Sequence, residues 1–172
     1  MKVASTHSAR IVILLLAVTL GACQPPPVKP SGPTEAERQH AALHALGFVE
    51  TDGGWLLNLP EPISFELDKD VLKASMQQSI TKTAAELINA HVNRLRIEGH
   101  TDNSGPREHN IALSLRRAHN VAHEFIANGF ASDHITERGL GPENPISPND
   151  TREGRAGNRC VLIIIPVDVL AQ

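Results

Sequence analysis

Strand patterns and helix patterns alternate from residue 63 to residue 167, and this alternation limits the possible folds more than any other feature of the chain. A strand with one buried face alternates apolar and polar side chains, whereas a helix repeats apolar side chains every three or four positions. The last run is apolar throughout, which predicts a strand in the middle of the sheet. The fold class is therefore α+β, a βαβαββ order in a single mixed sheet with helices packed on it. The predicted elements, in order, are strand 63–67, helix 71–91, strand 94–98, helix 107–128, strand 135–140 and strand 161–167.

The N-terminus resembles the signal peptide of a bacterial lipoprotein. Two cations, Lys2 and Arg10, precede an apolar run that is about half as long as a membrane-spanning helix needs to be. Small residues then stand directly before Cys23, as in the lipobox, in which the cysteine is acylated and becomes the new N-terminus. The resemblance implies that residues 1–22 are removed and that Gln24 favours sorting to the outer membrane, facing the periplasm. The alternative is an ordinary signal peptide followed by a structural cysteine.

Three further segments follow the signal peptide. Residues 23–34 combine the lipidated cysteine with a proline-rich linker, whose composition favours an extended conformation. Residues 35–59 are predicted to form a helix and a hairpin, because Thr34 and Glu37 match a capping box and an Asp-Gly-Gly turn follows. We interpret this helix and hairpin as an adaptor, and residues 60–168 as the main domain.

The composition excludes several classes of function. A formal net charge of -3 lacks the basic footprint of a general nucleic-acid binder, so no nucleic-acid partner is expected. Four phenylalanines, one tryptophan and no tyrosine are too few for a stacking platform that binds single strands. Two cysteines do not make a disulfide scaffold, and Cys160, which opens the last apolar run, is expected to be inert.

One face of the predicted helix 107–128 is polar. With Asn110 set to zero on a helical wheel, Ser114 and Arg117 lie within about 40° of it, beside the apolar stripe. A carboxylate binds an ammonium group and a guanidinium binds a carboxylate, so Asp102 and Arg117 together suit a zwitterionic amino-acid centre. A simple ion pair between the two residues explains the pattern equally well. The predicted core stripe of this helix consists of Ile111, Leu115, Ala118, Ala122 and Phe125.

The same stretch resembles the signature of the OmpA-like C-terminal domain. The matching residues are Gly-His-Thr-Asp at 99–102, the pattern Asn-x-x-Leu-Ser-x-x-Arg-Ala at 110–118, and glycine-containing blocks at 139–141 and 154–159. The resemblance covers about residues 60–167. It implies a peptidoglycan-binding domain of the type found in peptidoglycan-associated lipoproteins.

The resemblance also implies roles for individual residues. Asp102 and Arg117 match the positions that bind the ammonium and the carboxylate of diaminopimelate in the peptide stem. Two positions depart from the family pattern: Asp68 often is Asn in such domains, and Cys160 stands where a second arginine is usual. The other positions that line the pocket by this resemblance are Asp68, Thr101, Asn110 and the loop backbone near Gly105.

Within the family, residues 35–59 resemble the corresponding part of lipoproteins of the YfiB type. Such proteins pair with a periplasmic repressor, YfiR, which restrains a diguanylate cyclase in the inner membrane. The resemblance implies that cell-wall binding is coupled to capture of a YfiR-like repressor and so to cyclic-di-GMP signalling. The alternatives are that the same side chains pack onto their own domain, and that the protein is a purely structural tether. The candidate docking residues are Leu43, Leu46, Phe48 and Trp55.

No catalytic residue, metal site or cofactor is expected. His119 and His123 are four positions apart on a predicted helix, but the sequence places no third ligand beside them. An enzyme that cuts peptidoglycan needs two carboxylates with different pKa values, a zinc site or an activated nucleophile. Asp102 beside Arg117 would be held ionised, which does not suit a general acid. We therefore expect a non-enzymatic binding protein, with a cell-wall hydrolase as the less favoured alternative.

Overall fold

The structure is a computed structural model that describes residues 32–60, 64–65 and 69–170. The predicted signal peptide, the predicted lipidation site Cys23, most of the proline-rich linker and Asp68 lie outside the described residues. Within the described part of the chain, no helix is both long enough and apolar enough to cross a bilayer.

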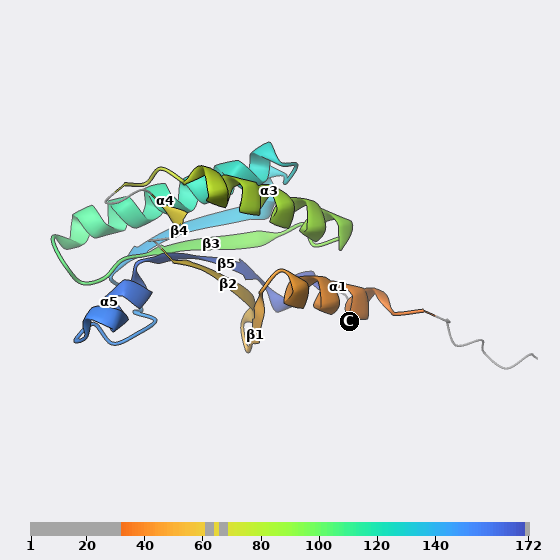
Figure 1. Cartoon of the computed structure of the whole chain (residues 1–172), viewed down its shortest axis with the longest axis horizontal. Coiled ribbons are helices and arrows are strands. Elements are labelled where there is room, and N and C mark those ends of the chain that lie inside the picture. Colours follow the sequence, from red (N-terminus) through yellow and green to blue (C-terminus); the bar gives the residue numbers. More distant parts are fainter. Residues whose placement is uncertain (1–31, 61–63, 66–68, 171–172) are drawn as a thin grey trace, which may run out of the picture. The chain divides into compact units, whose positions relative to one another are not determined.

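A five-stranded mixed sheet organises the described residues (Figure 1). The strands are β1 (Val49–Thr51), β2 (Gly54–Pro60), β3 (Leu95–His100), β4 (Ile135–Gly141) and β5 (Cys160–Ile165). Their order across the sheet is β1-β2-β5-β3-β4, in which β3 and β4 are parallel and the other neighbours are antiparallel. Every residue of β5 is buried, since this strand lies in the middle of the sheet. The predicted central strand is thus confirmed.

Two long helices, α3 (Ala74–Asn89) and α4 (Arg107–Ala127), lie along the same face of the sheet (Figure 1). Both are predicted from the apolar periodicity and both are confirmed. A shorter helix, α1 (Glu35–Ala45), precedes the sheet and begins at the predicted capping box. There the Thr34 hydroxyl accepts a hydrogen bond from the Glu37 N–H at 3.2 Å, and the Glu37 carboxylate accepts one from the Thr34 N–H at 2.7 Å.

The predicted core stripe of α4 is wrong in the first half of the helix. Leu115 is 46% exposed, and Ile111 is only half-buried. The polar side chains of Asn110, Ser114 and Arg117, predicted at the boundary of the core, are buried instead. The helix is therefore rotated relative to the prediction, and its polar stripe faces the protein interior.

Glycines in β3 and β4 explain this rotation, because they let α4 approach the sheet too closely for large side chains to fit between them. A Cβ atom on Gly99 would lie 2.0 Å from the carbonyl oxygen of Ser114, and one on Gly139 would lie 2.6 Å from the Cβ of Leu115. The Ser114 hydroxyl accepts a hydrogen bond from the Gly141 N–H at 2.9 Å. The backbone of α4 thus fills the space over these strands, and the larger apolar side chains lie beside it.

β2 takes the place that the sequence analysis gave to residues 63–67 as the first strand of the domain. It pairs antiparallel with β5 from Trp55 to Pro60. Only two residues of the predicted strand are described, and one of them, Phe65, forms an isolated bridge with Leu72. The hairpin that was interpreted as an adaptor is therefore part of the main sheet, because its second strand covers one side of β5.

The candidate docking residues pack onto their own domain, which is the alternative that the sequence left open. Leu43, Phe48 and Trp55 are buried in the main hydrophobic core, and Trp55 is only 1% exposed. Leu46 is partly buried against the same core. Two histidine rings of α1 lie edge-on against the Trp55 ring, with centroid distances of 5.2 and 4.6 Å. In the folded domain these four side chains hold α1 and the hairpin in place, and Leu43, Phe48 and Trp55 are too deeply buried to contact a partner.

A short helix, α5 (Arg152–Asn158), lies in the proline-containing connection from β4 to β5 and was not predicted. Its sequence has no apolar periodicity, so the local pattern gave no signal. The Thr151 hydroxyl caps the helix by accepting a hydrogen bond from the Gly154 N–H at 3.0 Å. The Asn158 side chain exchanges two hydrogen bonds with the backbone of Ser147, each 2.8 Å long, which fixes the connection against the helix.

Candidate functional site

Asp102 lies at the corner where the chain leaves β3 and turns toward the N-terminus of α4. Both oxygens of its carboxylate are fixed. Oδ1 accepts a hydrogen bond from the Ser104 N–H at 2.9 Å, and Oδ2 accepts one from Nη1 of Arg159 at 2.8 Å. Asp102 is 9% exposed, whereas the Arg159 side chain is about one-third exposed. The corner therefore holds an ion pair that is open to solvent on its arginine side.

The carboxyl group of Asp102 is ionised at neutral pH. Burial opposes ionisation, but the Ser104 N–H and the Arg159 guanidinium outweigh it and hold the pKa of Asp102 below its usual value. A carboxylate that keeps its charge and accepts charge-assisted hydrogen bonds is a binding group for an ammonium ion. It is poorly suited to donate a proton as a general acid.

Asn110, on the first turn of α4, holds the loop that follows Asp102. Its side-chain amide donates hydrogen bonds to the carbonyl oxygen of Ser104 at 2.8 Å and to that of Asp102 at 3.4 Å. Gly105 lies in the same loop with φ at +83°, a conformation that side chains other than glycine rarely adopt. The loop shape is therefore set by one buried amide and one glycine, both of which the sequence analysis assigned to the site.

Thr101 joins this corner to the sheet. Its N–H donates to the carbonyl oxygen of Gly141 at 2.9 Å, which extends the pairing of β3 with β4 by one residue. Its hydroxyl is buried and has no hydrogen-bond partner among the residues that the structure describes. A buried hydroxyl beside an ionised carboxylate is a group whose hydrogen bond a bound ligand could complete.

Arg117 differs most from its predicted position. It is 1% exposed, and its Nε and Nη2 donate to the carbonyl oxygen of Lys69 at 3.1 and 3.0 Å. Its guanidinium carbon lies 5.0 Å from the centroid of the Phe65 ring, within the range of a cation–π contact. Asp102 forms an ion pair with Arg159. Arg117 therefore binds α4 to the chain segment that crosses it, and in the free protein it lies beneath the surface.

Neighbouring residues of α4 grip the same segment. Nε of Arg116 lies 2.6 Å from Oδ2 of Asp70, and the Asn120 side chain donates to the Asp70 carbonyl oxygen at 2.8 Å. The hydrogen bond from Arg116 holds the pKa of the Asp70 carboxyl group below its usual value, against the opposing effect of burial. Three polar residues of α4, Arg116, Arg117 and Asn120, thus hold the chain at Lys69 and Asp70, directly after the predicted site residue Asp68.

The structure gathers four of the six predicted site residues at one corner, namely Asp102, Thr101, Asn110 and Gly105. Arg117 is held below that corner by its contacts with the segment at Lys69, and Asp68 lies outside the described residues. The sequence analysis missed Arg159 as the ion partner of Asp102. The signal was present, because Arg159 ends one of the matched blocks, but spacing alone could not show which acid it faces.

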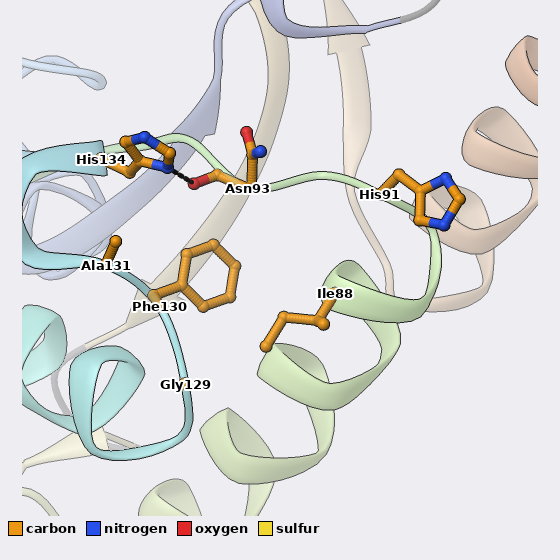
Figure 2. A pocket seen from close by; sticks show the side chains of 7 residues that line it. All are labelled: Ile88, His91, Asn93, Gly129, Phe130, Ala131 and His134. Carbon is orange, nitrogen blue, oxygen red and sulfur yellow. Dashed lines mark hydrogen bonds between the residues drawn. The ribbon is translucent and has the colours of Figure 1, made fainter.

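A separate cavity of about 430 Å³ lies at the opposite end of α4, beyond its last turn (Figure 2). The Phe130 ring and the Ile88 side chain face it, and Nδ1 of His134 is hydrogen-bonded to the carbonyl oxygen of Asn93 at 3.2 Å. No residue of the predicted site lines this cavity. Its lining residues are Ile88, His91, Asn93, Gly129, Phe130, Ala131 and His134.

The two histidines weighed as metal ligands lie on the exposed surface of α4. Nδ1 of His119 lies 3.0 Å from the carboxylate of Glu137 on β4, which accounts for its position without a metal. In the described ranges, no group of three or more histidine, cysteine, aspartate or glutamate residues is arranged to hold a metal ion. Burial raises the pKa of the Cys160 thiol to about 12, so this cysteine is protonated and unreactive at neutral pH.

The sheet order and the loop-to-helix corner at Asp102 define an OmpA-like domain. The sequence profile described as the OmpA family matches residues 64–159, more than half of the chain. The chain therefore belongs to the OmpA family, as the motif at residues 99–118 predicts.

Relatives and solved structures agree with this assignment. The outer-membrane lipoprotein YfiB of Pseudomonas aeruginosa is 37% identical over 165 residues, which are 94% of this chain and 96% of the relative. The peptidoglycan-binding protein ArfA of Mycobacterium tuberculosis is 42% identical over 104 residues, which are 60% of this chain and 32% of the relative. The periplasmic domain of Helicobacter pylori MotB superposes with a TM-score of 0.62 at 26% identity, covering 70% of this chain and 81% of that domain.

These similarities confirm two predictions made from the sequence. The predicted fold class is confirmed by the match to the MotB periplasmic domain. The predicted resemblance to lipoproteins of the YfiB type is confirmed over nearly the full length. The protein is accordingly placed at the outer membrane, lipid-anchored and facing the periplasm.

Proposed function

We propose that this lipoprotein binds peptidoglycan non-covalently, through the diaminopimelate of the peptide stem, at the corner formed by Asp102. The observation that carries the proposal is the ionised Asp102 carboxylate, fixed by the Ser104 N–H and by Arg159 within the family's own motif. The matching relative ArfA is named a peptidoglycan-binding protein, which supports the same ligand class. The ammonium group of the stem residue binds Asp102, where it meets a negative charge that is already formed.

The carboxylate of the same stem residue is assigned to Arg117 by its position in the family motif. In the free protein Arg117 is buried and donates to the Lys69 carbonyl oxygen, so a ligand reaches it only by entering below the surface of the corner. The Arg159 side chain, about one-third exposed and already paired with Asp102, is a second cation at the same corner. A ligand that carries both charges can therefore replace the internal ion pair with two external ones.

The test is co-sedimentation with purified peptidoglycan after the substitution Asp102→Asn. Asparagine can still accept the Ser104 N–H, but it removes the charge that binds the ammonium group. A charge-assisted hydrogen bond contributes about 1.5–3 kcal/mol, so we expect the affinity to fall roughly 10- to 100-fold. Asp133→Asn, an exposed acid in the short 3-10 turn before β4, is the matched control. Equal pelleting of both variants would contradict the proposal.

We propose that the protein has no catalytic role toward its ligand. The carboxylate at the corner is held ionised, and the Ser114 hydroxyl is buried and engaged with the Gly141 N–H rather than with a base. The alternative function is that of a cell-wall hydrolase. A zymogram in which the full chain clears embedded peptidoglycan would establish hydrolase activity, whereas we expect the gel to stay opaque.

We further propose that peptidoglycan binding is coupled to capture of a YfiR-like periplasmic repressor that controls a diguanylate cyclase. Support comes from the similarity to YfiB, which extends over 94% of the chain and so includes α1 and the hairpin. Since Leu43, Phe48 and Trp55 are buried and Leu46 is partly buried, a partner would contact other, exposed residues of that segment. Val49 on the edge strand β1 is 62% exposed and is the leading candidate. A purely structural tether remains the alternative function.

Deleting residues 35–59 does not test this coupling, because it removes β1 and β2 from the sheet. A surface variant does. We expect Val49→Asp to reduce capture of the repressor in a pull-down, because it places a charge in an apolar contact. Ile146→Asp, in the connection from β4 to β5, is the control at another exposed apolar position, 46% exposed. Equal capture by the two variants would exclude this surface and favour the structural tether.

A further inference from the structure

His100 is a buried imidazole without a hydrogen-bond partner. It is the last residue of β3 and is 4% exposed. Neither Nδ1 nor Nε2 of its ring has a hydrogen-bond partner in the part of the chain that the structure describes. Two unpartnered nitrogens in one buried ring are uncommon, because most buried polar side-chain atoms are bonded. This environment suits a neutral imidazole better than an imidazolium, whose two N–H groups would both need acceptors.

The position of His100 connects it to the ligand loop. A register shift in the pairing of β3 with β4 falls between Gly99 and His100, so the strand is already irregular there. The next residue, Thr101, is held to Gly141 through its N–H, and Asp102 follows it. A displacement of the imidazole is therefore transmitted through a single fixed residue to the carboxylate that binds the ligand.

The charged groups around His100 are already engaged. Oε1 of Glu98, two residues earlier on β3, lies 3.0 Å from Nε of Arg96 and 3.9 Å from Nη1 of Arg138. Asp102, two residues later, is bonded to Arg159. The residue paired with His100 on β5 is Cys160, whose thiol is neutral and a weak acceptor. A proton added to His100 would therefore have to draw Glu98 or Asp102 away from an arginine, or move the ring toward water.

The electrostatics of the ring agree with this geometry. Burial lowers the pKa of His100 below the ordinary value of 6.5, and the negative charge of Glu98 only partly opposes this. The ring is thus mainly neutral at pH 7, and it takes up a proton only as the pH falls further below 6.5.

We propose that neutral His100 is a positioning residue for Asp102, and that its protonation disrupts the corner and releases peptidoglycan. This inference rests on the proposed function, since it concerns the same site. It makes ligand binding depend on pH in a range where the ion pair of Asp102 with Arg159 does not change, because the pKa of the Asp102 carboxyl group lies below its ordinary value of 3.8. His100 directly precedes the loop, and it gains its charge only as the pH falls below the ordinary histidine value of 6.5.

The experiment measures peptidoglycan co-sedimentation of the full chain between pH 7.5 and pH 5, with wild type, His100→Gln and His109→Gln. Glutamine keeps a polar side chain that cannot be protonated, and His109 is an exposed histidine in the first turn of α4. For wild type and His109→Gln we expect binding to weaken by up to tenfold per pH unit below the pKa of His100. For His100→Gln we expect binding to vary much less over this range. A steep loss in His100→Gln equal to that of wild type would overturn the inference.

A second measurement separates this inference from the proposed function. The NMR signal of the Ser104 amide reports the geometry of the corner without ligand, because this N–H is bonded to Asp102. We expect its chemical shift to follow the titration of the His100 Cε1–H signal in wild type, and to lose this inflection in His100→Gln. A Ser104 signal that ignores the His100 titration would overturn the inference even if peptidoglycan binds. Wild type that fails to bind at any pH, with a coupled Ser104 signal, would reject the proposed ligand and keep the coupling.

Discussion

Arg117 shows how a charged side chain can serve the interior of a protein. A buried guanidinium is stable only when its N–H groups are hydrogen-bonded, and here two of them share the Lys69 carbonyl oxygen while the guanidinium carbon lies over the Phe65 ring. Lysine offers neither the parallel donors nor the planar face. Arginine at this position therefore stabilises the fold, apart from the ligand contact that we propose for it.

The substitution Arg117→Lys tests this structural role. We expect it to lower the free energy of unfolding by about 1–3 kcal/mol, because the Lys69 carbonyl oxygen loses two donors and Phe65 loses its guanidinium partner. Urea denaturation monitored by circular dichroism measures the change. The neighbouring Arg116→Lys, at a half-exposed position paired with Asp70, should cost no more than about 0.5 kcal/mol. Equal losses in the two variants would show that burial does not distinguish these arginines.

At the residue scale, the sequence predicts the site where its members are local and misses it where they are distant. Asp102, Asn110 and Gly105 lie within one loop and one helical turn, so a motif can place them together. Arg159 is 57 positions from Asp102, and only the antiparallel pairing of β3 with β5 brings them into contact. No spacing rule encodes that distance.

At the element scale, the contact between α4 and the sheet depends on glycines rather than on a stripe of apolar side chains. A helical wheel assumes that the most hydrophobic face is the buried one. That assumption fails here because Gly99, Gly139 and Gly141 bring the helix backbone against the strands, where only small or polar groups fit. The existence and length of α4 could be predicted from periodicity, but its rotation depends on residues in two other elements.

The substitution Gly99→Ala tests this close contact. The added methyl group would lie 2.0 Å from the Ser114 carbonyl oxygen, so α4 must move away from β3. We expect a loss of at least about 3 kcal/mol in the free energy of unfolding, above the usual range for overpacking because the obstacle is backbone. Gly53→Ala, in the hairpin turn, meets no atom within 4 Å and should change stability by less than about 0.5 kcal/mol. Thermal denaturation of both variants measures the difference. A Gly99→Ala protein with an unchanged melting temperature would contradict the close contact between α4 and β3.

At the scale of the whole molecule, α1 and the hairpin share one core with the OmpA-like fold. Leu43, Phe48 and Trp55 belong to the same buried cluster as Ile163 and Ile165 of the central strand. The sequence suggested a separate adaptor because a helix and a hairpin with good turn signals precede the family motif. It could not show that β2 pairs with β5, since that pairing joins segments about a hundred residues apart.

This shared core predicts a single unfolding transition. Trp55 is the one tryptophan of the chain and is 1% exposed within the hairpin, so its fluorescence reports that part of the molecule. Far-UV circular dichroism reports mainly α3 and α4. We expect the two signals to give the same urea midpoint, because β2 cannot leave β5 without exposing the core. A tryptophan transition at clearly lower urea would show that α1 and the hairpin unfold as a separate unit.

The last prediction concerns the pH dependence of stability, which combines the buried histidine with the paired carboxylates. In the unfolded chain the imidazole of His100 has a pKa near 6.5, and in the folded protein its pKa is lower. Below pH 6.5 the unfolded chain therefore binds more protons at His100 than the folded protein does, so the free energy of unfolding decreases. The pKa values of Asp70 and Asp102 also lie below their ordinary value of 3.8, so their contribution is present above that pH and is lost as the solution is acidified further. We expect the free energy of unfolding to be constant from pH 8 to 7, and to fall below pH 6.5 by at most about 1.4 kcal/mol per pH unit from His100. A second decrease is expected below pH 3.8.

The variant His100→Gln separates the two decreases. In it the first decrease should be much reduced and the second should remain, and urea titrations at pH 8, 7, 6, 5, 4 and 3 measure both. If the first decrease is the same in this variant as in wild type, another group causes it and the buried imidazole does not control the acid response.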